Sequence, residues 1–445
     1  MADVAARDNG LTMTAFENLG LEIGEDIDWG SATPINHVAE VISDSKLKNA
    51  MAKCTAKSML LHGNTDHDLP ARQCALVLPA LKQRFVLSQT HAVPEIKRSD
   101  ELVVEIHAIG LNPIDWKSVD YGYGIPTLPY VAGRDFAGVV VKAPSAPSHI
   151  QLGDVVLCGS TDYRDQRKAA YQQYAIASEH TVCRLPGHVS TSQGAALGVA
   201  YIAASLALGV CLGVRFPKAG SGKGAASADI RKIVRRQRLE DLPQDQVAEC
   251  VAMEEQDLPE AGEWIVIWGG SSTSALFLSQ LARLAGLKVI LVVDVAKHGA
   301  RMVESRGVLL IDSHSRDRAS QIIRGASGGK LRFGIDTVGK PTAEALAKCL
   351  QAGGDRKAHI VGLAALPKER LPGVVYHSVP VKLFHEVPEV GSSLMAWLEQ
   401  ALQSGILSLP TIETAPGGLE GINAALDRMR QGRISGKRLV VPLMS

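Results

Sequence analysis

The feature that most constrains the fold is a repeated alternation of short apolar runs and helical patterns in the second half of the chain. The apolar runs have the length of β-strands and are WIVIWGG (264–270), KVILVVD (288–294), VLLID (308–312), FGIDTVG (333–339) and AHIVGLA (358–364). Helical patterns separate these runs at 276–286, 298–307 and 342–354. Such alternation is typical of a parallel sheet with helices on both faces, so the sequence predicts a doubly wound α/β domain.

A different rhythm comes earlier in the chain. Apolar and polar residues alternate, with Gly and Pro between the runs, in RQCALVLP (72–79), ELVVEIHAIG (101–110), FAGVVVKA (136–143) and GDVVLCGS (153–160). This pattern favours an antiparallel, barrel-like β domain. The C-terminal part adds amphipathic helices in 392–405 and 419–443, and the latter stretch ends in a final strand.

The composition excludes several classes of protein. With 46% hydrophobic and 21% charged residues, the chain is too apolar for disorder and typical of a globular enzyme. A net charge of +1 gives no global field for nucleic acid or membrane, so we expect neither as a partner. The seven cysteines are scattered without a C-x-x-C pair, and the first ten residues show no secretory signal. We therefore expect a reducing, cytoplasmic location.

Three segments depart from these rhythms. Residues 194–214 are 21 uncharged positions, long enough to span a membrane, but their Ala and Gly content favours a buried helix. Residues 1–70 have weak periodicity and are interpreted as an extension with a short helix at 43–54. Residues 215–261 carry a basic block and then an acidic block, which indicates a mobile or self-paired insertion, most simply a solvated surface loop. In the alternative interpretation, the basic block of this insertion contacts an anionic partner.

The first strand of the α/β pattern leads into a Gly-Gly-Ser-Ser turn and then a helix. Gly269 and Gly270 allow a tight turn and a close backbone approach, and Ser271 to Ser274 stand where a helix N-terminus can hold a pyrophosphate. Ala275 takes the place of the third glycine of the dinucleotide fingerprint. This context predicts a dinucleotide site.

The choice of nucleotide stays open in the sequence. Asp294 ends the second strand, 24 residues after Gly270, where an acid binds the ribose 2′-hydroxyl of NAD(H). Lys297, His298 and Arg301 follow at once and are able to hold the 2′-phosphate of NADP(H) instead.

Four motifs together resemble the medium-chain dehydrogenase/reductase superfamily, and most closely the fungal trans-acting enoyl reductases. They are GLNPIDWK (110–117), PYVAGRDFAGVVV (129–141), WIVIWGGSSTSA (264–275) and ISGKRLVV (434–441). The resemblance covers about 72–214 and 262–445. It implies a GroES-like β domain from 71–193 and 366–445, a Rossmann domain at 194–365, NADPH as cofactor and a polyketide synthase as partner.

Zinc-dependent relatives use a Cys after the first strand and a Gly-His-Glu motif. The corresponding places here read Asn112-Pro113 and Gly133-Arg134-Asp135. Neither Cys nor His is present to bind a catalytic zinc, so the resemblance implies a zinc-free member with no metal site.

The resemblance also implies the residues of the site. Those expected at the cofactor are Ile114, Asp115, Trp116, Lys117, Gly270, Ser271, Ser272, Thr273, Ser274, Ala275, Asp294, Lys297, Ser313, Gly362, Leu363, Ile434 and Ser435. Those expected at the substrate are Ala195, Ala196, Leu197, Val199, Tyr201, Val381, Leu383 and Phe384. Ser313 replaces a Tyr that often packs on the adenine, which puts adenine stacking in doubt.

Without zinc, reduction of an activated C=C bond is the favoured chemistry, because hydride transfer to the β-carbon needs only a proton donor at the α-carbon. Lys117, in a stretch interpreted as a turn and loop, is the first candidate: it either donates a proton and stabilises an enolate or holds the cofactor. Tyr201 is a second candidate donor, or a satisfied pocket wall.

The leading interpretation is an NADPH-dependent enoyl reductase of secondary metabolism, acting as a monomer or homodimer on a small-molecule or acyl-carrier-bound substrate. One alternative is a quinone or alkenal reductase. Another is a member of the same fold that binds cofactor but performs no redox step, or serves as a scaffold.

Overall fold

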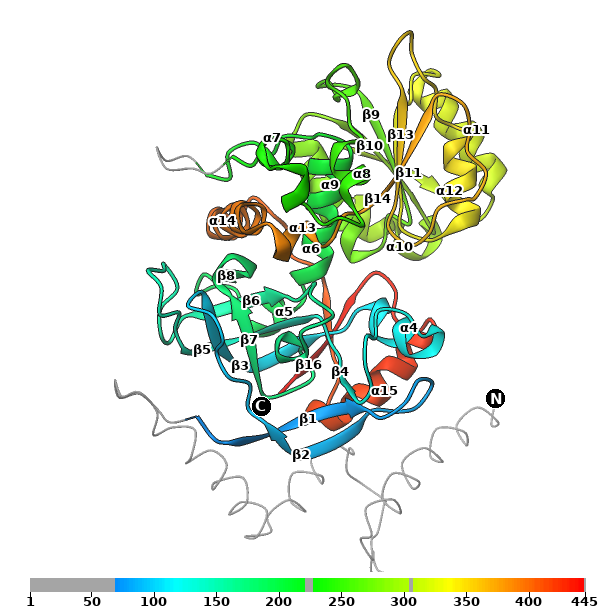
Figure 1. The fold of residues 1–445 in the computed structure, drawn as a ribbon. Helices are drawn as coiled ribbons and strands as arrows, with labels where there is room; N and C mark the ends of the chain where they lie inside the picture. Colours follow the sequence, from blue (N-terminus) through cyan, green and yellow to red (C-terminus); the bar gives the residue numbers. More distant parts are fainter. Residues whose placement is uncertain (1–68, 221–226, 304–306, 444–445) are drawn as a thin grey trace, which may run out of the picture. The chain divides into compact units, whose positions relative to one another are not determined.

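The computed structural model describes residues 69–220, 227–303 and 307–443 (Figure 1). The extension expected over 1–70, with its helix at 43–54, therefore lies almost wholly outside the described residues.

The doubly wound parallel domain predicted by the second half of the chain is confirmed. Six parallel strands lie in the order β11-β10-β9-β12-β13-β14. Their bounds are Trp264–Trp268 (β9), Lys288–Val293 (β10), Val308–Asp312 (β11), Phe333–Asp336 (β12), Ala358–Gly362 (β13) and Val374–Ser378 (β14). The central strands β9 and β10 are apolar except for the exposed Lys288 at the start of β10, because helices cover both faces.

The helices of this domain divide between the two faces of the sheet. They are α9 (Thr273–Leu284), α10 (Val295–Val303), α11 (Arg316–Ser327) and α12 (Lys340–Ala347). Helix α9 packs in one core cluster and α11 with α12 in the other. The predicted boundary at 365 is wrong, because β14 pairs with β13 as the sixth strand of the sheet. Its sequence, VVYHS, ends in polar residues and does not have the pattern of an apolar run.

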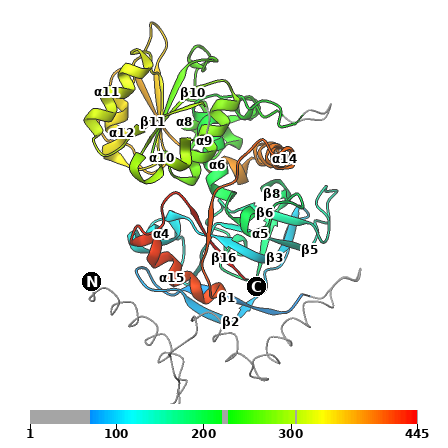
Figure 2. The same cartoon turned by 180° about the vertical axis from the view of Figure 1, so that it is seen from behind.

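The β-rich domain consists of two sheets. The larger has the order β15-β16-β3-β5-β6-β8 with β7 also paired to β3, and the smaller has the order β2-β1-β4. The bounds are Arg72–Leu78 (β1), Val86–Ala92 (β2), Glu101–Gly110 (β3), Tyr130–Val131 (β4), Asp135–Lys142 (β5), Val155–Gly159 (β6), Tyr174–Ser178 (β7), Val182–Arg184 (β8), Ile412–Thr414 (β15) and Arg438–Pro442 (β16). Helices α4 (Pro113–Tyr121) and α15 (Gly418–Arg430) pack side by side on it (Figure 2).

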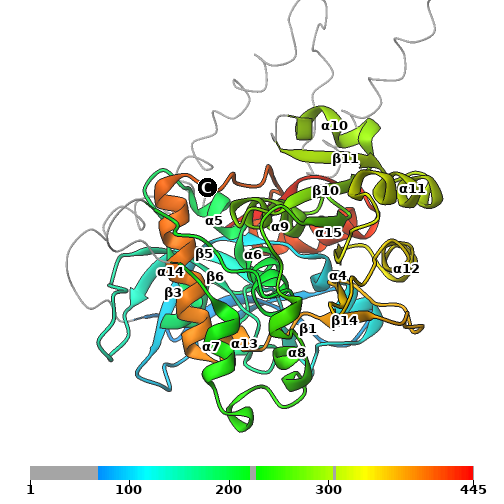
Figure 3. The ribbon, with the colours of Figure 1, turned by 90° about the horizontal axis from the view of Figure 1, so that it is seen from above.

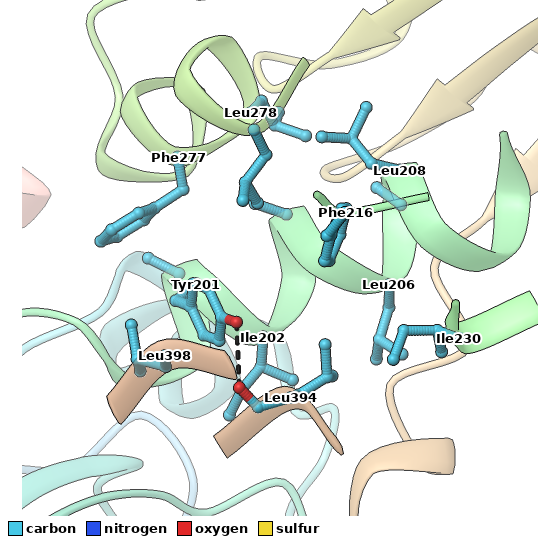
Figure 4. Close-up of a cluster of buried hydrophobic side chains, with 14 of the residues drawn as sticks. Tyr201, Ile202, Leu206, Leu208, Phe216, Ile230, Phe277, Leu278, Leu394 and Leu398 are labelled. Atoms are coloured by element: carbon cyan, nitrogen blue, oxygen red, sulfur yellow. Dashed lines mark hydrogen bonds between the residues drawn. The ribbon is translucent and has the colours of Figure 1, made fainter. Parts of the chain in front are cut away.

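The uncharged segment 194–214 forms buried helical structure, as predicted. The end of α5 (Thr191–Ala195) overlaps the start of this segment, which then contains α6 (Gly198–Leu206) and a π-helical turn, Ala207–Cys211. Helix α6 packs against α9 and, with α13 (Leu383–Glu386) and α14 (Pro388–Ser404) nearby, closes a large apolar cluster (Figure 4). A search of the described residues finds no helix that is both long and apolar enough to cross a membrane.

The insertion 215–261 is not the solvated loop that its charges predicted. Its described part folds into α7 (Ile230–Arg236) and α8 (Val247–Val251), and α7 packs beside α14 (Figure 3). Ile230 and Val234, one helical turn apart, are buried in the main core. The self-pairing alternative holds, since Arg231 forms an ion pair with Glu255 at 2.7 Å.

We expect Ile230→Ala to lower the free energy of unfolding by about 2–4 kcal/mol, because it opens a cavity in the main core. Urea denaturation of the full chain measures the effect. Ile322→Ala is the matched control, because Ile322 is 42% exposed on α11, and its expected cost is below about 1 kcal/mol. Equal, small effects for both variants would contradict the buried position of the insertion.

Candidate active site

The expected dinucleotide cradle lies at the carboxyl end of β9. Gly269 has φ +83°, and a Cβ there would meet Thr337 Oγ1 at 2.2 Å. A Cβ on Gly270 would meet Val293 Cγ1 at 2.7 Å. The Ser272 hydroxyl caps α9 by accepting from the Ala275 amide at 3.2 Å. The two glycines thus bring the turn close to the sheet, and the 12-residue helix α9 begins at this turn, with its N-terminal amides facing the cradle.

The sheet order explains why a ligand would bind at this point. The chain runs from β9 to β10 and β11 on one side and then returns to β12, β13 and β14 on the other. A parallel sheet opens a crevice where the strand order reverses, here between the ends of β9 and β12. The predicted residues Asp294, Ser313 and Leu363 directly follow strands at this same edge, and Gly362 is the last residue of β13.

Thr337 and Val338 also lie at the reversal point and were not predicted. The Thr337 hydroxyl donates to the Gly269 carbonyl at 3.1 Å and lies 3.2 Å from the Ser272 hydroxyl. Asp336 Oδ1 accepts from the Val338 amide at 3.0 Å, which holds this turn. Their signal was present in FGIDTVG, which the sequence analysis used only as a strand.

Acidic side chains and a histidine gather at the strand ends of β10 and β11. Asp294 Oδ1 accepts from the Lys297 amide at 2.9 Å and so starts α10. His314 Nδ1 lies 3.0 Å from Asp312, and its Nε2 lies 3.8 Å from Asp294. The hydrogen bond to Asp312 raises the pKa of His314. Within the described part of the chain, this is the one group of three such side chains spaced for a metal ion, and it belongs to the adenosine end of the expected nucleotide site.

Two of the three basic residues expected near the adenosine hold a loop of the other domain, and desolvation lowers the pKa of one of them, His298. His298 Nε2 lies 3.0 Å from the Ser435 hydroxyl, and Arg301 donates to the Gly436 carbonyl. The predicted contact residue Ser435 is thus brought against α10, and Ile434 precedes it in the same loop. Lys297 remains exposed and is the cation left for a 2′-phosphate.

Most of the stretch 110–122, interpreted as a turn and loop, is instead helix α4 (Pro113–Tyr121). Asn112 is its N-cap, Pro113 is its first residue, and Asp115 Oδ2 accepts from the Asn112 amide at 2.7 Å. Asn-Pro followed by an acid is a capping signal that the sequence analysis missed. Asp115 is fully buried, and desolvation raises its pKa from 3.8 to about 6.

A buried polar network joins α4 to three other elements. Asn112 Nδ2 donates to Asp135 Oδ2 at 3.0 Å, and Arg438 donates to Asn112 Oδ1 at 2.8 Å. Arg438 also forms an ion pair with Asp135, whose other oxygen accepts from the Val199 amide at 2.7 Å. A Cβ on Gly198 would meet Asp135 Oδ1 at 2.1 Å, so only glycine fits there.

The donor set at this network does not fit a catalytic zinc. Both polar atoms of the Asn112 amide are engaged, the Asp135 carboxylate is paired, and Arg134 is a cation. Zinc prefers nitrogen and sulfur ligands, which these residues do not supply.

Lys117 lies on the partly exposed side of α4. Its ammonium is 5.7 Å from the centre of the Trp116 ring, and the Arg430 guanidinium is 5.6 Å from the same ring. Arg430 also forms an ion pair with Asp120 at 2.8 Å, so α15 fixes this part of α4. The Lys117 ammonium therefore lies near the Trp116 ring, and Nζ is still able to rotate toward a ligand.

Tyr201 does not have the position predicted for a proton donor. It is fully buried, and its hydroxyl donates to the Leu394 carbonyl at 3.0 Å (Figure 4). Its ring lies edge-on to Phe277 and parallel to Trp397. Burial raises the pKa of Tyr201 above its usual range, so the phenol is a core residue and its predicted role is wrong.

The other predicted substrate residues divide by exposure. Val199 and Val381 are partly exposed and able to meet a ligand. The remaining ones are buried, and they are Ala195, Ala196, Leu197, Leu383 and Phe384.

We expect stability to depend on pH through Asp115. Its folded pKa of about 6 exceeds the unfolded value, so the folded protein binds more protons between about pH 4 and 6 and loses stability as pH rises through that window. The free energy of unfolding of Asp115→Asn, measured relative to wild type by urea unfolding, should increase by about 3 kcal/mol between pH 4 and pH 7. Parallel pH profiles would show that the Asp115 pKa is not raised.

Comparisons with known proteins agree with this geometry. Residues 98–187 match the alcohol dehydrogenase GroES-like domain. A trans-enoyl reductase of Fusarium mangiferae is 27% identical over 370 residues, which cover 77% of this chain and 92% of that protein.

Solved structures show the same fold. The CurK enoyl reductase matches with a TM-score of 0.61 at 16% identity, covering 83% of this chain and 99% of that chain. The quinone oxidoreductase of Escherichia coli, solved in complex with NADPH, matches with a TM-score of 0.60 at 16% identity over the same shares. In sequence the chain is similar to fungal trans-enoyl reductases and, over residues 98–187, to the alcohol dehydrogenase GroES-like domain, and its fold is similar to that of solved enoyl and quinone reductases, in agreement with the resemblance that its motifs indicated.

Proposed function

We propose that the protein reduces an activated C=C bond with NADPH, as a trans-enoyl reductase in polyketide or related secondary-metabolite biosynthesis. The observation that carries this proposal is the double-glycine cradle at the strand reversal, with a serine-capped helix pointing its amides into it. The names of the relatives support the choice of substrate class.

The bound nucleotide would supply a hydride to the β-carbon of the substrate. Ser271 to Ala275 would hold its pyrophosphate, Gly362 and Leu363 would lie beside the nicotinamide, and Ser435 would close on it from the β-rich domain. Lys117 is proposed to give the α-carbon its proton, directly or through water, because its ammonium is partly exposed on α4.

The substrate is proposed to be a free or acyl-carrier-bound enone, and the partner a polyketide synthase. The protein would act in the cytoplasm as a monomer or homodimer, and without zinc. The β-rich domain would contribute the catalytic side chain, and the parallel domain would bind the cofactor.

Two features of the adenosine end bear on the nucleotide in opposite directions. Asp294 and Asp312 place carboxylates at neighbouring strand ends, which favours NADH. Lys297 is an exposed cation at the first turn of α10, which favours NADPH.

We expect NADPH to bind more tightly than NADH in a fluorescence titration. Lys297→Ala should raise the Kd of NADPH about tenfold, the loss of one charged hydrogen bond, and leave the Kd of NADH unchanged. Lys232→Ala, which removes an exposed lysine on α7, is the control and should change neither. Tighter binding of NADH, unaffected by Lys297→Ala, would reverse the nucleotide assignment, and binding of neither nucleotide would overturn the reductase proposal.

We expect Lys117→Ala to lower kcat about 100-fold on a crotonyl thioester, because the proton donor is lost, while the Kd of NADPH stays the same. Tyr201→Phe is the control: it removes a core hydrogen bond at a cost of about 1–3 kcal/mol of stability and should leave kcat unchanged. A raised Kd of NADPH with unchanged kcat would make Lys117 a cofactor ligand instead. An unchanged rate and Kd would remove it from the site.

The second candidate is a quinone or alkenal reductase, favoured by the fold shared with quinone oxidoreductases. Comparing kcat/KM for a crotonyl thioester with that for benzoquinone separates the two functions. A higher value for the quinone would select the second candidate.

A further inference from the structure

Three arginines are buried among the residues that the structure describes, and one of them has no carboxylate partner. Arg332 is paired with Glu263 at 2.9 Å, and Arg438 is paired with Asp135. Arg134 is 4% exposed, and no described carboxylate lies within ion-pair distance of it. A buried charge is normally paired, because taking it out of water is costly.

The contacts of Arg134 are neutral. Its guanidinium carbon lies 3.7 Å above the Tyr163 ring, and Nη2 donates to the Tyr130 hydroxyl at 3.1 Å and toward the Gly124 carbonyl at 3.5 Å. Burial raises the pKa of both tyrosines, so their phenols stay neutral at physiological pH. Neither phenol is therefore a counter-charge for the guanidinium.

The two acids nearest in the network are engaged elsewhere. Asp135 uses one oxygen for the Val199 amide and the other for Asn112 and Arg438. Asp115 accepts from the Asn112 amide, and its second oxygen has no hydrogen-bond partner. Desolvation raises the pKa of both acids, and the charge of Arg134 opposes that rise without forming an ion pair with either one.

Arg134 also has a position that suits a ligand. It directly precedes Asp135, which contacts the start of α6 through the Val199 amide and the N-cap of α4 through Asn112. Val199 is a partly exposed residue of the expected substrate wall, and α4 carries Lys117. Arg134 is therefore adjacent in the chain to the residue that joins these two elements.

We propose that Arg134 binds the carbonyl oxygen of the substrate and stabilises the negative charge that forms on it. This inference rests on the proposed function. When hydride adds to the β-carbon, the C=C electrons move to form an enolate, and the charge appears on the carbonyl oxygen. Arg134 donates hydrogen bonds to that oxygen and keeps its protons; the α-carbon then takes a proton and the carbonyl re-forms.

The first test compares two buried arginines in the full-length protein. Arg134→Gln should lower kcat on a crotonyl thioester about 100-fold with the Kd of NADPH unchanged, as expected for loss of an oxyanion donor. Without ligand its Tm should stay the same or rise, because an unpaired buried charge is removed. Arg332→Gln should leave kcat unchanged and lower Tm by about 3 °C or more, because Glu263 loses its partner. Arg134→Lys, which keeps the charge but not the planar fork, should recover part of kcat.

The second test does not need turnover. Sodium crotonate, added to the nucleotide-bound protein, should raise the Tm of wild type and of Arg332→Gln but not of Arg134→Gln. Equal shifts in all three proteins, or an Arg134→Gln variant with lowered Tm and unchanged kcat, would overturn the proposal and make Arg134 a structural residue. No turnover by wild type, together with a crotonate shift that Arg134→Gln abolishes, would overturn the reductase function but leave the oxyanion site in place.

Discussion

The buried network around Asp135 is the interaction on which the rest of the site depends. One carboxylate receives hydrogen bonds or charge from the N-cap of α4, the first residue of β16 and an amide near the start of α6. These groups lie 23, 64 and 303 residues from Asp135 in the chain. A buried carboxylate is stable only when such partners form hydrogen bonds or ion pairs with it. The network therefore fixes the relative positions of α4, β5, α6 and β16. It thereby sets where α4, and with it Lys117, can stand.

Two buried arginines near Asp135 have different partners. Arg438 has a structural role, because it forms an ion pair with the Asp135 carboxylate. Arg134, four residues after Tyr130, rests on neutral groups and keeps its charge for a ligand. The nucleotide cradle shows a parallel contrast: its glycines are required by close packing against β10 and Thr337, whereas its serines remain partly exposed. At both sites, the groups assigned to ligand binding are those that are not already engaged in packing or ion pairs within the fold.

Five strands of the parallel sheet and the longer strands of the β-rich domain were predictable from the sequence because their patterns are local, whereas β2, β4, β7, β8 and β15 were not predicted. The order of the six strands in the parallel sheet was not predictable in this way. Strand β14 was missed because an edge strand that ends in His-Ser lacks the apolar run of a central strand. Helix α11 has so polar a sequence that only a few buried residues, such as Ala319 and Ile323, fix its position. In the insertion, blocks of charge obscured the spacing of Ile230 and Val234, which is helical and apolar.

The sequence by itself determined the parallel α/β pattern, the double-glycine turn and the family resemblance, because each depends on residues close together in the chain. It could not determine the partners of Tyr201, Arg134 or Asp135. A buried phenol in a core and a phenol in a pocket have the same local sequence, and an arginine shows no sign of whether an acid will reach it. Only the tertiary structure decided these roles, because burial and pairing are set by side chains that arrive from distant parts of the chain.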